Sequence, residues 1–126
     1  MEIPANWILD RSIPNLLAVA SDPAGDARLI VASGTSSEPE VEADKFEVSE
    51  GYGLPFFIRD SSVSKDGDWM VDYRFVSERP GGPTVMAGRA LFVKTSRALL
   101  SLTLEAPVEQ FEPRLPVLDE ARRSLR

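Results

Sequence analysis

Hydrophobic and polar positions alternate most regularly between residues 68 and 106 of this 126-residue chain. Three alternating runs, 68–76, 84–94 and 97–106, are separated by residues typical of turns. Because successive side chains leave a β-strand on opposite sides, a period of two predicts strands that bury one face. The pattern therefore predicts a meander of three antiparallel strands as the central part of the fold.

The alternation also assigns a core face to each predicted strand. The large hydrophobic residues at every second position are Trp69, Val71, Tyr73 and Phe75 in the first run and Leu100, Leu102 and Leu104 in the last. Leu91 and Val93 of the middle run are assigned to the same core face. The opposite face then carries Met70, Met86, Phe92 and Leu99. Such an apolar face is rarely left wholly in water, and methionine suits contacts that adapt to different partners.

Shorter runs complete the predicted elements. Turn signals bound three further strands, at 15–21, 27–33 and 54–62. A C-terminal helix is expected from about Leu115, with one face formed by Leu115, Leu118, Ala121, Arg122 and Leu125, where Arg122 interrupts the apolar stripe. Ser36 to Glu50 begins with acidic residues that suit a helix N-terminus but offers few large hydrophobic residues, so it is interpreted as a short or irregular helix.

These elements predict one α+β domain over residues 1–126. An antiparallel sheet of about six strands is expected to carry the C-terminal helix on one face and the shorter helical segment on the other. The apolar stripe of the C-terminal helix is expected to pack on the Trp69, Val71, Tyr73 and Phe75 side of the sheet.

The absence of cysteine and histidine removes several classes of chemistry. Without cysteine there are no disulfides, thiolate nucleophiles or thiolate metal sites. Without histidine there is no Ser-His-Asp triad and no histidine-based zinc site. Acid–base catalysis would fall to carboxylates, lysine or tyrosine with displaced pKa values. We therefore predict no enzymatic activity, no catalytic residue, no metal and no cofactor.

The alternative is a small carboxylate-and-tyrosine enzyme or a small-molecule-binding α+β domain. It needs a pocket in which Asp68 or Asp72 converges with Tyr52 or Tyr73. Asp72 and Tyr73 are neighbours on a predicted strand and would point to opposite faces, so that pair is not expected to converge.

The net charge of −6 and the pI of about 4.7 favour some partners over others. Such a chain is repelled by phosphate backbones and anionic membranes, which counts against nucleic-acid binding and suits a basic protein partner. No run approaches the roughly 18 apolar residues of a membrane span, so direct membrane insertion is not expected. Residues 1–4 do not resemble a secretory signal, which predicts a cytoplasmic protein, or a periplasmic protein or lipoprotein if a leader precedes them.

Several local sequences resemble a known superfamily. Ile3 to Trp7 resembles a P-x-x-W opening, and Ala90 to Val93, Leu100 to Pro107, Phe111 and Ser124 to Arg126 resemble a closing pattern. There a strand is followed by a small-residue-Pro loop, a phenylalanine and a helix. On these residues the chain resembles the PsbP/Mog-like superfamily of three-layer α-β-α sandwich domains. It departs from the pattern at Ser36 to Gly53, where a longer and more apolar helix would be expected.

The resemblance implies a role in protein contacts. The superfamily includes extrinsic photosystem subunits, a Ran-binding nuclear-transport factor, bacterial lipoproteins and Eag-type chaperones of type VI secretion effectors, most of them non-enzymatic. It therefore implies a protein-binding domain, such as an adaptor or a secretion-effector chaperone. Because a fold alone does not determine function, this remains an expectation.

A partner site is predicted on the second face of the sheet. The face carries Met70, Met86, Phe92 and Leu99, and the segment expected to cover it holds the densest charge of the chain. This acidic cluster consists of Glu38, Glu40, Glu42, Asp44, Glu47 and Glu50, of which the first three are assigned to the partner site. We hypothesise a partly covered groove with an acidic rim, suited to an apolar or basic segment of another protein or to a homodimer. The alternatives are that the helix covers the face completely and that the acidic residues are only a solvated surface.

Overall fold

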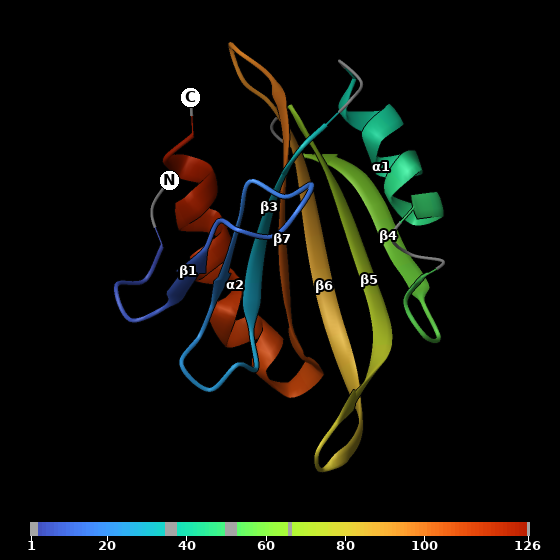
Figure 1. Cartoon of the computed structure of the whole chain (residues 1–126). Helices are drawn as coiled ribbons and strands as arrows, with labels where there is room; N and C mark the ends of the chain where they lie inside the picture. Colours follow the sequence, from blue (N-terminus) through green and yellow to red (C-terminus); the bar gives the residue numbers. More distant parts are fainter. Residues whose placement is uncertain (1–2, 35–37, 50–52, 66, 126) are drawn as a thin grey trace.

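The computed structural model describes residues 3–34, 38–49, 53–65 and 67–125. Within them, seven antiparallel strands form one sheet in the order β1-β2-β3-β7-β6-β5-β4 (Figure 1). The strands are β1 (Ile8–Asp10), β2 (Ala18–Ser21), β3 (Arg28–Ser33), β4 (Ile58–Lys65), β5 (Asp68–Arg79), β6 (Gly82–Lys94) and β7 (Leu99–Pro107). The sheet exceeds the expected size of about six strands because β1, with three exposed residues, shows no alternation that would predict it.

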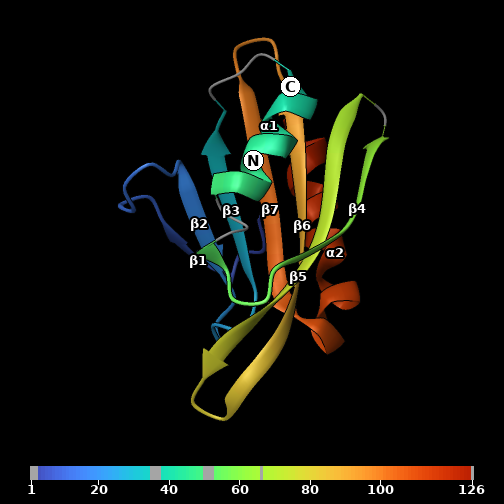
Figure 2. The same ribbon diagram turned by 90° about the vertical axis from the view of Figure 1, so that its right-hand side faces the viewer.

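Two helices complete three layers. α2 (Val108–Arg123) packs on one face of the sheet against β6 and β7, and α1 (Pro39–Ser49) lies on the opposite face against β5 and β6 (Figures 1 and 2). The predicted α+β sandwich, with the C-terminal helix on one face and a shorter helix on the other, is therefore confirmed. Neither helix of the described ranges is long and apolar enough to span a membrane.

The larger core lies between α2 and the sheet. Leu118 and Ala121 of α2 have no exposed surface, and Phe111 is buried with them. These side chains belong to one cluster with strand residues that leave the sheet on the same side, among them Ala20, Leu29, Val31, Leu91, Val93, Leu102 and Leu104. The helical spacing that predicted the stripe of α2 therefore identified its buried face.

α2 begins at Val108 rather than near Leu115. Pro113 and Pro116 lie inside the helix, and the ribbon changes direction after its first turns (Figure 1). A proline cannot donate the helical backbone hydrogen bond, which accounts for a bend at this place. The helix expected from about Leu115 therefore corresponds to the second part of α2.

A smaller core lies beneath α1. Ala43 and Phe46 of α1 pack on side chains of β5 and β6, namely Val71, Tyr73, Phe75, Met86, Ala90 and Phe92. The Phe46 ring lies 5.2 Å from the ring of Tyr73 and 6.0 Å from that of Phe92, measured between centroids. Leu54 and Phe57, which were expected in a strand from 54 to 62, precede β4 and pack against this core.

The predicted face of β5 was wrong. A turn of two residues joins β5 to β6, since Arg79 pairs with Gly82, and this register places Phe75 opposite Met86 and Trp69 opposite Phe92. Directly paired residues share a face, so Trp69 and its alternate neighbours face α1, whereas Met70 packs in the α2 core. A shift of one residue in register exchanges the two faces of a strand, so a face assigned without this turn could fall on either side of the sheet. The faces predicted for β6 and β7 are confirmed.

Candidate functional site

α1 covers only part of its face of the sheet and leaves a groove beside it. The groove has a volume of about 940 Å³. Its floor is formed by Ala32 of β3, Ser101 of β7 and Phe92 of β6, and α1 forms one wall with Val41 and Phe46. The side chain of Val41 is 43% exposed. An apolar surface is thus open to solvent on the face that the smaller core only partly fills.

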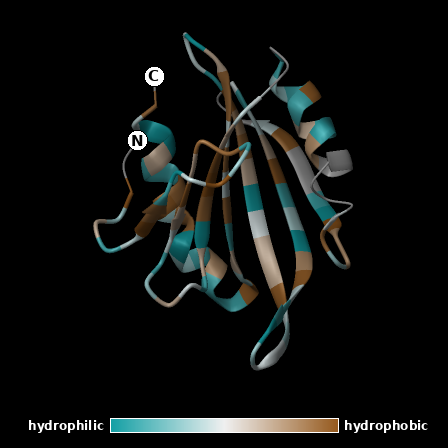
Figure 3. Ribbon diagram, viewed as in Figure 1, coloured by the Kyte–Doolittle hydropathy of each residue, from teal (hydrophilic) through white to brown (hydrophobic). Residues whose placement is uncertain are grey.

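The second wall of the groove is the loop between β1 and β2. Pro14, Asn15 and Leu16 line the groove from this side. Asn15 has a φ of 67°, and asparagine is among the few residues that enter the left-handed region readily. The backbone N–H of Leu17 then donates to the carbonyl of Val31 and ties the end of the loop to β3. Hydrophobic residues continue beyond this wall, along β1 and β2 (Figure 3).

A smaller inner pocket of about 260 Å³ lies next to the groove. The two hollows share Leu16, Ala32, Phe46 and Ser101 in their linings, so they are adjacent. The apolar lining of the inner pocket comes from Ile13, Leu16, Val19, Ile30, Ala32, Phe46 and Leu54, and its polar lining from Arg28, Tyr73, Ser101, Thr103 and Glu105. The inner pocket therefore combines mainly aliphatic walls with a small set of polar groups.

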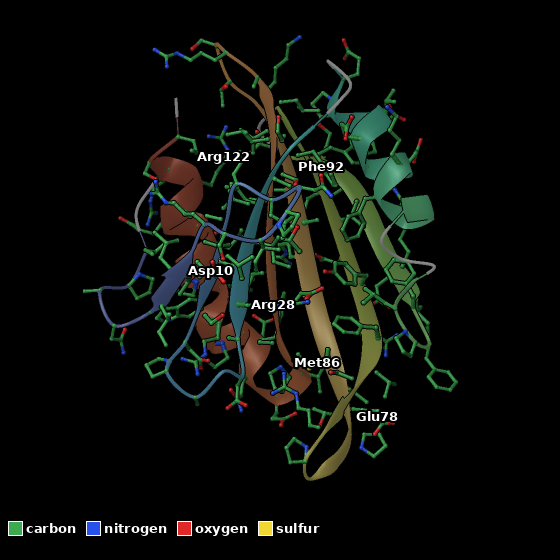
Figure 4. All side chains as sticks on the ribbon, in the orientation of Figure 1. Asp10, Arg28, Glu78, Met86, Phe92 and Arg122 are labelled. Atoms are coloured by element: carbon green, nitrogen blue, oxygen red, sulfur yellow. The ribbon has the colours of Figure 1, made fainter. Side chains whose placement is uncertain are left out.

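The polar groups form a row across four strands. Arg28 of β3 pairs with Glu105 of β7, Glu105 with Gly88 of β6, and Gly88 with Tyr73 of β5. Nε and Nη2 of Arg28 donate to Oε1 of Glu105 at 3.0 and 2.8 Å, and the Tyr73 hydroxyl donates to Oε2 at 2.5 Å. Arg28 is the first residue of β3 and lines the inner pocket on the α1 side of the sheet (Figure 4). The row thus links residues that are far apart in the sequence.

Gly88 makes this row possible. A Cβ atom at Gly88 would lie 2.2 Å from Cζ of Tyr73 and 2.6 Å from its hydroxyl oxygen. The Tyr73 ring therefore lies directly on the backbone of β6 and reaches across it to Glu105. Glycine is needed here for close approach, since the phenol could not otherwise meet a carboxylate two strands away.

Glu105 is a buried carboxylate with both oxygens occupied. It is 4% exposed, and Tyr73 is 1% exposed. Burying a carboxylate is costly unless it is paired and hydrogen-bonded, and here Arg28 supplies the charge and Tyr73 a further hydrogen bond. Among the described residues no group of three carboxylates could hold a metal ion.

Comparison with solved structures identifies the fold of this chain. No protein-family model and no curated protein matches the sequence. Among solved structures, the PsbP protein of the cyanobacterium Synechocystis sp. is 15% identical, with a TM-score of 0.60 over 98% of this chain and 82% of that one. Protein PA94 of Pseudomonas aeruginosa, of unknown function and described as a putative regulator, is 14% identical, with a TM-score of 0.54 over 100% of this chain and 84% of that one.

The chain has a PsbP-like fold. LpqN of Mycobacterium tuberculosis, a protein involved in cell envelope biogenesis, is also similar, at 17% identity and a TM-score of 0.48 over 95% of this chain and 79% of that one. At these identities the likeness concerns the fold alone. The likeness to the Synechocystis protein and to PA94 confirms the fold that the opening and closing sequence patterns implied.

The PsbP-like sheet separates the predicted apolar site residues. Phe92 lies on the floor of the groove, and Met86, 4% exposed, is buried farther along the same face (Figure 4). Leu99 is buried too, and its backbone accepts a hydrogen bond from Gly34. Met70 packs on the opposite face, against the α2 core, so its placement on the second face was wrong.

The predicted acidic residues lie at the start of α1. Glu42 lines the groove, while Glu38 and Glu40 are exposed. Two cations lie among them: Lys45 is 3.8 Å from Glu42, and Arg59 is 3.6 Å from Asp44. The rim is therefore acidic but partly neutralised.

The carboxylate–tyrosine pairs considered for an enzyme are not assembled. Asp68 and Asp72 lie on the α2 side, where they pair with Arg122 and Arg89 at 2.6 and 2.7 Å. Hydrogen bonding to these carboxylates raises the pKa of both arginines. Tyr73 faces the other way, and Tyr52 is outside the described residues. The pair with Asp68 also explains why Arg122 interrupts the stripe of α2, since it attaches the helix to the start of β5.

Sequence reasoning missed Arg28 and Glu105. One signal was available for Glu105, because it ends a run of alternating leucines at a position that shares its face with Ser101 and Thr103. A charged residue in such a run stands out from the leucines around it. Its partners, however, follow only from the pairing of β3, β7, β6 and β5.

Proposed function

We propose that this PsbP-like domain is a non-enzymatic binding domain that holds an apolar segment of another protein in the groove beside α1. The observation that carries the proposal is the incomplete layer on this face. α1 packs on β5 and β6, while the groove over β3 and β7 keeps an apolar lining that is open to solvent. A segment laid there would bury this lining and complete the layer.

The charges around the groove favour a segment that also carries a basic residue. Four acidic residues, Glu38, Glu40, Glu42 and Asp44, lie at or near the α1 wall, against the two cations Lys45 and Arg59. The balance is two negative charges, in a chain whose net charge is −6. Complementary charge steers a partner to its site and disfavours acidic competitors.

The polar row supports binding rather than catalysis. Both oxygens of Glu105 accept hydrogen bonds, so neither is placed to abstract a proton from a substrate. The groove is also wide, whereas an enzyme of this size would need an enclosed site with converging groups. An adaptor, or a chaperone that shields an apolar segment of a secreted effector, would use such a surface. A second copy of this chain is a further possible occupant.

A site-specific cross-linker tests the proposal. Val41 and Val108 are both valines in the first turn of a helix, 43% and 45% exposed, but only Val41 lines the groove. Each is replaced in turn by the photoreactive p-benzoylphenylalanine, and the products formed in the extract of the source cells are sequenced by mass spectrometry. We expect cross-links from position 41, absent from position 108, to one apolar segment that contains lysine or arginine.

The products distinguish the alternatives. A dominant product of twice the mass of the chain identifies the segment as a second copy and supports a homodimer. Equal products from both positions, or products with acidic and polar segments, contradict the proposal.

A further inference from the structure

Arg28 keeps hydrogen-bond donors that the fold does not use. A guanidinium carries five N–H groups, and Glu105 accepts from two of them, one on Nε and one on Nη2. Among the described residues Glu105 is the only partner of Arg28, and 52% of the arginine side chain is exposed. The Nη1–Nη2 end of the guanidinium, the edge that takes a carboxylate in a bidentate pair, is therefore not engaged.

The position of this guanidinium is fixed by the buried residue to which it is hydrogen-bonded. Glu105 is buried, accepts from two nitrogen atoms of Arg28 and is itself held by the Tyr73 hydroxyl. The Tyr73 ring in turn lies on Gly88 and packs against the rings of Phe46 and Phe57. A charged group oriented by a buried carboxylate loses little conformational freedom when a ligand binds. The row therefore supports Arg28 as a preorganised donor rather than a mobile surface cation.

The surroundings of Arg28 define the rest of the ligand. Arg28 lines the inner pocket together with the hydroxyl-bearing residues Ser101 and Thr103, and aliphatic side chains such as Val19 and Ile30 form its walls. The volume of about 260 Å³ lies just below the range typical of drug-sized ligands. A ligand must therefore be compact and mostly apolar, with one group that can pair with a guanidinium.

We infer that the inner pocket binds a monocarboxylate with a compact apolar body, its carboxylate on the Nη1–Nη2 edge of Arg28 and its apolar body between β3 and Phe46. A carboxylate matches the guanidinium edge in charge and geometry. An ammonium group would be repelled by Arg28 and would find both oxygens of Glu105 occupied. An uncharged alcohol would leave most of the donors unpaired.

The test compares ligands that share one alkyl chain. Octanoate, 1-octanol and octylammonium are titrated into the ¹⁵N-labelled protein and followed by amide chemical shifts. We expect octanoate to bind at one saturable site, to shift the amides of Arg28, Ser101 and Thr103, and to bind on the order of tenfold more tightly than 1-octanol. Octylammonium is expected to bind more weakly than either.

A charge-neutral variant shows whether Arg28 causes the preference. Arg28→Gln alone would leave Glu105 buried without its counter-ion, so it is combined with Glu105→Gln. The double variant is expected to bind octanoate and 1-octanol equally. Arg97→Gln, at an exposed position in the β6–β7 turn, is the control and is expected to keep the tenfold preference.

Three results would overturn the inference: no saturable octanoate binding, equal binding of octanoate and 1-octanol by the natural chain, or a preference that survives in the double variant. If the double variant does not fold, the ratio measured on the natural chain decides. The inference does not depend on the proposed function. Cross-links from Val41 without octanoate binding would contradict the inference and leave the proposed function standing. Octanoate binding without such cross-links would contradict the proposed function and leave the inference standing.

Discussion

At the scale of single residues, the contact between Tyr73 and Gly88 holds the polar row together. Gly88→Ala places a methyl group 2.2 Å from a ring carbon of a tyrosine that is 1% exposed. We expect the free energy of unfolding to fall by about 1–3 kcal/mol, the usual cost of overpacking a core. Chemical denaturation measures this loss, provided that the free energy of unfolding falls with denaturant concentration at the same slope in the variant and in the natural chain.

Gly81→Ala is the matched control for this substitution. Nothing lies within 4 Å of a Cβ atom at Gly81 and its φ is not positive, so its free energy of unfolding is expected to change little. Equal losses for Gly81→Ala and Gly88→Ala would mean that the backbone, not the Tyr73 contact, determines the effect. In a Tyr73→Leu background the loss from Gly88→Ala is expected to shrink, because the clashing ring is gone.

The local sequence could indicate the residues of the polar row only one at a time, and not the pairs that they form. Tyr73 follows from the alternation of β5, and a charged residue beside the leucines of β7 stands out. Arg28 and Glu105, however, are separated by 77 positions and Tyr73 and Glu105 by 32, so only the strand order brings them together. A pair of this kind is set by the strand pairing, which no short sequence window contains.

At the scale of secondary-structure elements, α2 supplies the buried face that stabilises the larger core. Leu118 has no exposed surface, so Leu118→Ala is expected to lower the free energy of unfolding by about 2–5 kcal/mol, through lost burial and the cavity left behind. Deletion of residues 116–126 removes Leu118 and Ala121 together and is expected to unfold the domain. Thermal melting checks both variants.

Glu112→Ala is the control for these changes in α2. Glu112 is exposed on the same helix, so its replacement is expected to leave the melting temperature nearly unchanged. A truncated chain that melts cooperatively at the natural temperature would show that α2 does not hold the core.

The elements differ in how well the sequence predicted them. The alternation in β5, β6 and β7 and the apolar stripe of α2 were sufficient to predict these elements, because each element buries one face along many residues. The face of β5 was assigned wrongly because the two-residue turn between Arg79 and Gly82 was not used to set the register. β1 and the first turns of α2 were missed, since β1 is exposed throughout and two prolines interrupt α2.

At the scale of the whole molecule, the two helical layers are unequal. α2 has 16 residues, whereas α1 has 11 and packs mainly on β5 and β6. A groove lies at the uncovered part of the α1 face, and of the four predicted apolar residues only Phe92 lies on its floor, beside Ala32 and Ser101. Sequence could not show how far α1 reaches, because that depends on where the helix lies on the sheet.

The central claim is that this uncovered face is the binding surface. The segment cross-linked from Val41 is made as a synthetic peptide. The most direct measurement is the dissociation constant of this peptide for the natural chain and for two variants that carry the same type of substitution. Val41→Asp places a charge in the groove and is expected to weaken binding on the order of tenfold or more, while Val108→Asp, equally exposed on the other helix, leaves the constant unchanged. Equal constants for all three chains, or equal weakening by both substitutions, would contradict the account.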